Sequence, residues 1–435
     1  MILFWKIAAK NILRNSRRSL ATGSAITAGF VGLTLLGGYI NSVHNSLKAN
    51  TIYINHVGHL SVYRRDATEQ FYIRPQKFQL TPDDLMKINQ VLEPYRNQIE
   101  LTSTYISGMG LISNGTKSIP FFATGVDPET ERKLRSHPFV LYWARDWVKN
   151  EGNVNLKSEG AKHPDSVSIT ARMGELIGQD PPFNLLSDEK RSVQLAARSY
   201  AGELNAVNAT LSVEHTTGVD LAEDTSLIAP LKLLQELFDT DGVQYLAIYM
   251  LPEFPVHDLL KRIQNDFETK KLNYQIFSFD DEAVSQIYVG TMSFLFTMAG
   301  FFIFLICGAV SLSIINAMTM GILERVKEIG TLRAIGYESS IVSKLFVREA
   351  VILTGFCLIA GVIVAESIAF VVNSLNIRFE PPAMAGDAQF SLTPTPQIYF
   401  VAAAAMLLLS AVTAFLAVRR KSKIKVIDLL TDTGA

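Results

Sequence analysis

Residues 283–323 decide the fold: AVSQIYVGTMSFLFTMAGFFIFLICGAVSLSIINAMTMGIL is a run of 41 residues without a charged side chain. A membrane helix needs only about 20 apolar residues. As one helix this run would be about 60 Å long, roughly twice the hydrocarbon thickness of a bilayer. Because the end near Ala283 also holds Ser285 and Gln286, we expect a membrane helix whose first three turns or so extend beyond the bilayer.

The segment that follows, ERVKEIGTLRAIG at residues 324–336, has a different pattern. Its apolar residues Val326, Ile329, Leu332 and Ile335 recur every three positions, and Glu324, Arg325, Lys327, Glu328 and Arg333 are charged. This spacing predicts a short amphipathic helix at the membrane surface, with a solvated loop as the alternative. We expect residues 324–344 to form the connection to the next membrane helix.

Three further apolar runs, at 19–41, 345–372 and 398–418, are long enough to span a bilayer. The basic segment 1–18 before them predicts an amphipathic helix on the membrane surface. Since no small-residue cleavage site follows the first run, we interpret it as a retained anchor rather than a signal peptide.

Small residues recur at a spacing of four in the first membrane run, at Ala21, Ala25 and Gly29. Such a smooth face predicts close helix packing, either within the chain or across a dimer contact.

Basic residues mark the inner side of the membrane. Segments 1–18 and 419–435 are rich in Lys and Arg, whereas the 373–397 connection contains only Arg378. The positive-inside rule therefore predicts cytoplasmic termini, a cytoplasmic 324–344 turn and an outer segment at 42–282.

The outer segment is long enough for its own core. Its alternating patterns predict strands at 59–63, 99–112, 118–126, 244–251 and 274–279, with helices at 85–92, 230–238 and 256–269. Asn114-Gly115 predicts a hairpin between the second and third strands. A less regular part at about 140–225 holds a strand-like run from Ser192 to Val213 and suggests an inserted subdomain. The expected fold is thus four membrane helices plus a large extracytoplasmic α+β domain between helices 1 and 2.

Signals for enzymatic chemistry are missing. No Gly-x-x-x-x-Gly-Lys-[Ser/Thr] loop, Gly-x-Ser-x-Gly or His-Glu-x-x-His occurs in the sequence, so we expect neither ATP hydrolysis nor hydrolase activity from this chain. Cys307 and Cys357 both lie in membrane runs. His56 and His59 have the spacing of half a metal site, but no third ligand is nearby, and a structural role is favoured.

The run EIGTLRAIG, directly after a membrane helix, resembles the signature of the FtsX/MacB/lipoprotein-release superfamily of ABC-transporter permeases. That resemblance implies a coupling helix that docks on a separate cytoplasmic ATPase, present in two copies, which binds ATP and Mg. It also implies a second permease, either identical or a close paralogue. No cofactor or metal in this chain and no nucleic acid partner are expected. The residues that it assigns to ATPase coupling are Glu324, Arg325, Glu328, Gly330, Arg333 and Gly336.

Three outer phrases, GHLSVY at 58–63, TGVDPE at 124–129 and GELNAV at 202–207, resemble the lipoprotein-release branch. This branch implies an inner-membrane permease that lifts acylated proteins out of the outer leaflet for a periplasmic carrier or adaptor. Candidates for contact with cargo or with the second permease are Tyr39, Tyr288, Met292 and Phe296. The alternatives are an exporter of a small molecule, peptide or toxin, a signalling protein that controls a cell-wall hydrolase, and a membrane-anchored binding protein without a motor.

Glu366 is the only charged residue between Ala350 and Val372. A carboxylate within a membrane run usually faces a cavity, a partner or the headgroups. Two interpretations stay open: the side chain reaches the outer membrane lipid headgroups, or it acts as a gate or latch.

Overall fold

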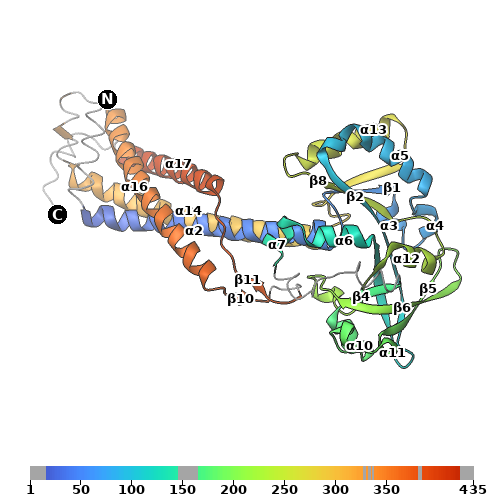
Figure 1. The fold of residues 1–435 in the computed structure, drawn as a ribbon. Coiled ribbons are helices and arrows are strands. Elements are labelled where there is room, and N and C mark those ends of the chain that lie inside the picture. The colour runs from blue at the N-terminus through green and yellow to red at the C-terminus, as the bar shows by residue number, and fades with distance from the viewer. Residues whose placement is uncertain are drawn as a thin grey trace. The chain divides into compact units, whose positions relative to one another are not determined.

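A computed structural model describes residues 16–145, 165–326, 330–331, 335, 338–380 and 385–421. The chain divides into two compact units, which we call the helix unit and the sheet unit (Figure 1). The helix unit comprises Met1–Val43, Ser293–Ile377 and Phe390–Ala435, and the sheet unit comprises His44–Met292 and Arg378–Gln389.

Four long helices are present among the described residues: α2 (Ser16–Ala49), α14 (Gln286–Glu324), α16 (Ser339–Ser374) and α17 (Pro396–Lys421). Each has a stretch long and apolar enough to cross a membrane. The prediction of four membrane helices is thereby confirmed. Helices α2, α16 and α17 extend beyond the predicted apolar runs at both ends, because helical hydrogen bonding continues after the side chains become polar. Helix α14 begins three residues later than predicted, at Gln286, and ends one residue later.

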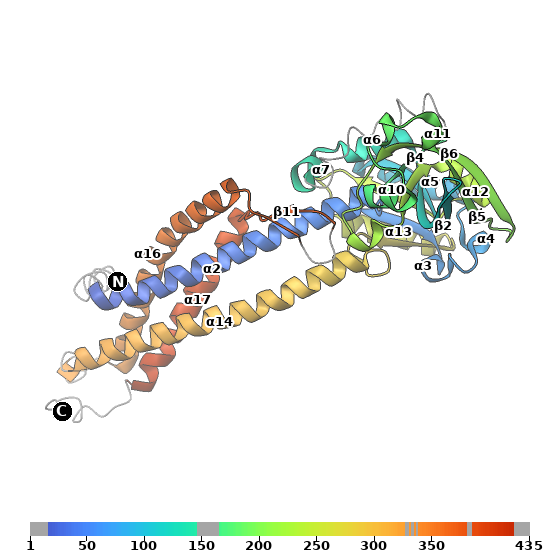
Figure 2. The same cartoon turned by 90° about the horizontal axis from the view of Figure 1, so that it is seen from below.

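Small residues allow the helices of this unit to approach closely. A Cβ atom added at Gly29 of α2 would lie 2.6 Å from Val310 of α14 and 3.1 Å from Met406 of α17. Phe30 is fully buried beside Gly361 of α16. Gly29, on the small-residue face predicted from the sequence, therefore serves packing within the chain. Figure 2 shows the four helices from a second direction.

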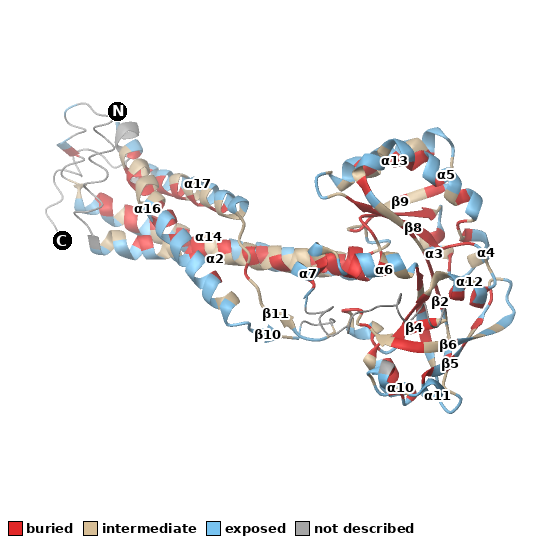
Figure 3. Cartoon of the chain, in the orientation of Figure 1, coloured by how far each residue is buried: buried red, intermediate tan, exposed pale blue. Residues whose placement is uncertain are grey.

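One half of the sheet unit is an antiparallel sheet with strand order β9-β1-β8-β2. The strands and two helices follow the chain order β1, α5, β2, β8, α13, β9, which is the ferredoxin-like βαββαβ arrangement. Thr81 and Asp84 form a capping box at the start of α5, which covers the helix predicted at 85–92. Buried faces of α5 and α13 complete the core of this half, while their opposite faces are exposed (Figure 3). The bounds are β1 (Leu60–Arg64), α5 (Pro82–Leu92), β2 (Ile99–Ser113), β8 (Tyr245–Met250), α13 (Val256–Thr269) and β9 (Tyr274–Ser278).

The other half is a closed ring of strands in the order β2-β3-β7-β4-β6-β5. Strand β2 belongs to both halves, because its first part pairs with β8 and its second part pairs with β3 and β5. The hairpin between β2 and β3 turns at Asn114-Gly115, as predicted, and Gly115 has a positive φ of 88°. The bounds are β3 (Ser118–Val126), β4 (Ser166–Ile169), β5 (Ser192–Arg198), β6 (Leu204–Glu214) and β7 (Ser226–Pro230).

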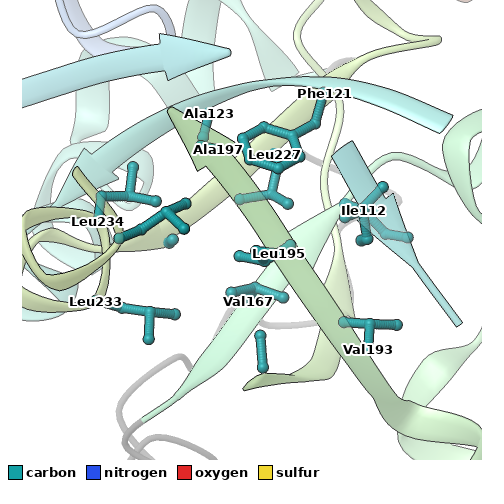
Figure 4. Packing of buried hydrophobic residues seen from close by; sticks show 14 of the residues in the cluster. Ile112, Phe121, Ala123, Val167, Val193, Leu195, Ala197, Leu227, Leu233 and Leu234 are labelled. Carbon is teal, nitrogen blue, oxygen red and sulfur yellow. The ribbon is translucent and has the colours of Figure 1, made fainter. Parts of the chain in front are cut away.

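Apolar side chains from all sides of the ring meet in its interior. Figure 4 shows Ile112, Phe121, Val167 and Leu195 pointing toward one another from four different strands. Helix α12 (Leu231–Phe238) adds Leu234 to the same core. The inserted part of the fold thus draws on β2, β3 and β7 in addition to the expected 140–225 stretch, because these three strands complete the ring.

A buried polar network lies in the sheet unit. Helix α6 (Pro128–Arg135) contributes Glu131, whose carboxylate binds His56 Nε2 at 2.6 Å and also Arg135. His215 contacts Ser168 at 2.9 Å and Ser226 at 3.0 Å. His59 Nδ1 accepts a hydrogen bond from the backbone N–H of Met250. His56 and His59 are therefore held by protein partners, in agreement with the structural role favoured by the sequence.

Burial and charge act oppositely on these groups. Burial alone would raise the pKa of Glu131, but His56 and Arg135 outweigh it and hold that pKa at about 2. Burial lowers the pKa of His59 to about 3, and it lowers the pKa of His215 well below its usual range. Both histidines are therefore neutral in the folded state at neutral pH.

A valine at Gly108 should destabilise the ring, because an added Cβ would overlap the Phe238 ring. We expect Gly108→Val to lower the free energy of unfolding by about 1–3 kcal/mol. The matched control is Met109→Val, which places the same side chain at the adjacent exposed position of β2 and should change stability by less than about 0.5 kcal/mol. Denaturant unfolding of the purified chain measures both, and equal stability of the two variants would contradict this packing.

Acid should destabilise the sheet unit well before its carboxylates titrate. Below about pH 6.5 the unfolded state protonates His59 while the folded state does so only near pH 3, so stability falls as the pH drops through this window. Each such histidine contributes a slope of up to about 1.4 kcal/mol per pH unit. Glu131 contributes over a lower pH range. The stability that its ionised carboxylate provides above about pH 4.5 is lost as the pH falls toward 2. Unfolding free energies of wild type and His59→Gln between pH 5 and 8 test this: the variant should show the smaller slope, and identical slopes would refute it.

Candidate coupling site

The predicted coupling segment starts where α14 ends. Glu324 is the last residue of that helix, and Arg325 follows it. Gly330 is buried. Glu328, Arg333 and Gly336 lie outside the residues that the structure describes, so their role stays a prediction.

Glu324 and Arg325 belong to a cluster of four charged residues, which we call the charged junction: Arg18, Glu324, Arg325 and Glu349. Arg18 Nη1 of α2 lies 2.8 Å from Glu324 Oε2 of α14. Arg325 Nη1 lies 3.3 Å from Glu349 Oε2 of α16, and Arg18 Nη2 lies 4.0 Å from Glu349 Oε1. Two positive and two negative side chains thus connect one end of three helices.

Burial makes these contacts stronger than ordinary surface ion pairs. The side chains of Glu349 and Arg325 are 5% and 11% exposed, whereas that of Glu324 is 43% exposed. Gly321 provides the space for Arg18, since a Cβ there would lie 3.0 Å from both terminal guanidinium nitrogens. A charge in such a place is costly unless it is paired, so the junction favours one arrangement of the helix ends.

Sequence reasoning did not identify Arg18 and Glu349 as parts of this site. The available signal was weak: Arg18 stands just before the first apolar run, and Glu349 lies near the start of the 345–372 run. Charges at the ends of membrane runs are common, and nothing in their spacing says which of them meet.

The residues predicted to contact cargo or a second permease lie in different surroundings. In the helix unit, Tyr39 stacks on Phe390 with ring centroids 5.0 Å apart, and Phe296 is 61% exposed. In the sheet unit, Tyr288 Oη lies 3.0 Å from His44 Nδ1, and Met292 is buried. Their role in contacts with cargo or another chain stays a prediction. Of the four, Phe296 is the most open to a partner.

Four apolar helices together with a large α+β unit define a membrane protein with a separate folded domain. Residues 300–426 match the family described as "FtsX-like permease C-terminal". ABC transporter permease YtrF of Bacillus subtilis (strain 168) is 34% identical over 89 residues, which are 20% of this chain and 20% of that protein. The chain therefore spans about a fifth of the length of this curated relative.

Two solved structures are also similar. The periplasmic region of MacB from Actinobacillus actinomycetemcomitans is 9% identical, with a TM-score of 0.34 over 51% of this chain and 88% of that one. The extracellular domain of the ABC-type transporter YknZ from Gram-positive bacteria is 12% identical, with a TM-score of 0.32 over 50% of this chain and 99% of that one.

The match over residues 300–426 and the similarity to YtrF support a relation to the FtsX/MacB-like permeases. The resemblance seen in residues 328–336 is thereby confirmed, since this run lies inside the matched segment.

Neutralising Glu349 should loosen the junction. Glu349→Gln removes the carboxylate between Arg325 and Arg18, and Arg325 keeps a buried guanidinium without its anion. Breaking a fully buried pair costs about 3–5 kcal/mol; because Arg18 keeps Glu324, we expect a loss of about 1–3 kcal/mol. Thermal unfolding in detergent measures it. Lys344→Gln, which neutralises an exposed side chain on the same helix outside the junction, is the control, and equal melting temperatures of the two variants would argue against the junction.

Proposed function

We propose that this chain is the permease subunit of a MacB-type ABC transporter, driven by a separate ATPase that binds ATP and Mg. The observation that carries the proposal is the family match over residues 300–426, which includes the EIGTLRAIG run between α14 and α16. In this proposal the 324–344 turn and both termini are cytoplasmic, two ATPase copies dock on a pair of permeases, and the 42–282 domain works outside the inner membrane.

The charged junction gives the proposal a physical route for motion. A force on the turn acts at once on Glu324 and Arg325, which are paired with residues of α2 and α16. Helix α14 then continues for 39 residues without an interruption of its hydrogen bonding. ATP-driven displacement of the turn would thus be shared by three helices and carried along α14, which is the mechanotransmission that we propose.

For the cargo, we propose an acylated protein that is removed from the outer leaflet and passed to a soluble carrier. The support is the resemblance of the 58–63, 124–129 and 202–207 phrases to the lipoprotein-release branch. Export of a small molecule, peptide or toxin through an adaptor and channel is the alternative. Purification from native membranes separates the two: co-purified acylated proteins support release, while a co-purified adaptor and channel would replace it with export.

Reversing the charge of Glu328 tests the coupling role. We expect Glu328→Lys to weaken ATPase association or to uncouple ATP hydrolysis, because a charged hydrogen bond to a cleft on the partner would become a repulsion. Association and permease-stimulated ATPase activity are measured with the purified partner. The control is Lys261→Glu, a charge reversal in α13 of the sheet unit.

Normal association and normal stimulation with Glu328→Lys would remove this residue from the coupling site. If Lys261→Glu also lost ATPase association and stimulation, the assay would be reporting misfolding rather than coupling.

A further inference from the structure

A pocket of about 510 Å³ lies in the helix unit, where α2, α16 and α17 meet. Its walls are mostly apolar and include the buried ring of Phe30 together with Leu358 and Ala403. It is open rather than enclosed, and Ile359 and Phe400 at its edge are among the strongly exposed apolar side chains. Its volume falls within the range of about 300–1,000 Å³ typical of small-molecule sites.

Two polar side chains stand at one end of this apolar pocket. Glu366 lines it, and within the described residues its carboxylate forms no ion pair with a basic side chain. Tyr399 also lines it, and its hydroxyl is buried without a hydrogen bond of ordinary geometry to any described residue. The two groups are near enough for the carboxylate to act electrostatically on the phenol.

The polar and apolar parts of the pocket lie at different depths. Glu366 is eight residues before the end of α16 at Ser374, or about 12 Å along the helix axis. Tyr399 is three residues after the start of α17 at Pro396. Leu358 lies eight residues further into α16 than Glu366, so the apolar end is about 12 Å deeper in the bundle. The pocket therefore has the polarity of an amphiphile, with its charged end toward the membrane surface.

We propose that this pocket binds an amphiphile with an alkyl tail and an ammonium head, which enters from the bilayer. The carboxylate of Glu366 would hold the ammonium group, and the Tyr399 hydroxyl would accept a hydrogen bond from it. The apolar walls would take the tail. This inference does not rest on the proposed transport function, because it concerns binding to this chain alone.

Charge and shape favour this occupant over others. An alkyl chain without a head would leave the Glu366 carboxylate without a counter-charge. An anionic amphiphile would place its charge against a carboxylate. A second protein chain would need a broad contact, whereas the pocket is small and flanked by Pro394 and Pro396.

Competition photolabelling tests the proposal. The full-length chain in phosphatidylcholine liposomes is labelled with a diazirine-bearing decylamine, and the labelled peptides are identified by mass spectrometry. We expect labels on α16 and α17 near Glu366 and Tyr399. Unlabelled decylammonium should compete at least about tenfold better than decanol, and decyl sulfate should compete least.

Three variants give the test its controls. Glu366→Gln should weaken competition by decylammonium about tenfold and abolish its advantage over decanol. Tyr399→Phe, which keeps the ring, should weaken it by a smaller factor. Ser367→Ala, next to Glu366 with its hydroxyl bonded to Ile363 within the helix, should behave like wild type.

Equal competition by decylammonium and decanol in the wild type would overturn the proposal. So would unchanged competition in Glu366→Gln, since the carboxylate would then have no part in binding. Size-exclusion chromatography shows whether Glu366→Gln is folded. If it is not, Tyr399→Phe decides, and unchanged amine selectivity in that variant would equally refute the site.

Discussion

The hydrocarbon core of a membrane tolerates unpaired charge poorly, and this constraint decides where ionic contacts of the helix unit lie. Helix α14 passes through 38 uncharged residues before Glu324, and its first acidic group is paired with Arg18 at once. Glu349, at the start of the apolar part of α16, is likewise paired, with Arg325. The charged junction therefore forms where α2, α14 and α16 each carry the charged side chains that border their apolar stretches.

In the sheet unit, strand β2 has a comparable role, because its two parts belong to two different cores. Residues near Ile99 pair with β8 in the ferredoxin-like half, and residues near Ile112 close the ring of the other half. A rotation of one half must twist this strand or break its ladder. Gly108 and Gly110 lie in the second part, where Phe238 and Phe121 leave no space for a Cβ. The two halves are thus linked by continuous backbone hydrogen bonding rather than by a flexible linker.

Most of this architecture could be predicted from local patterns. The membrane helices follow from apolar length, and the Asn114-Gly115 hairpin follows from turn chemistry. Strands β4 and β7 were not predicted, because each is short and largely buried, so no alternation of polar and apolar residues marks it. Likewise, the predicted run from Ser192 to Val213 is two strands, since the turn at 199–203 contains no strong two-residue hairpin signal. Of the candidate site, Glu324 and Arg325 were predicted but their partners were not. Arg18 is 306 positions from Glu324, and Glu349 is 24 positions from Arg325 on another helix, so both pairs form only through the tertiary fold.

The two carboxylates of α16, Glu349 and Glu366, differ in burial and in pairing. Glu349 is 5% exposed and lies between two arginines, so its charge is balanced within the chain. Glu366 faces an open apolar pocket in which its polar neighbour is a tyrosine hydroxyl. A neutral phenol cannot balance a carboxylate, and a membrane lipid tail cannot either. Glu349 is therefore part of the scaffold, whereas in the binding that we propose the counter-charge of Glu366 comes from the ligand.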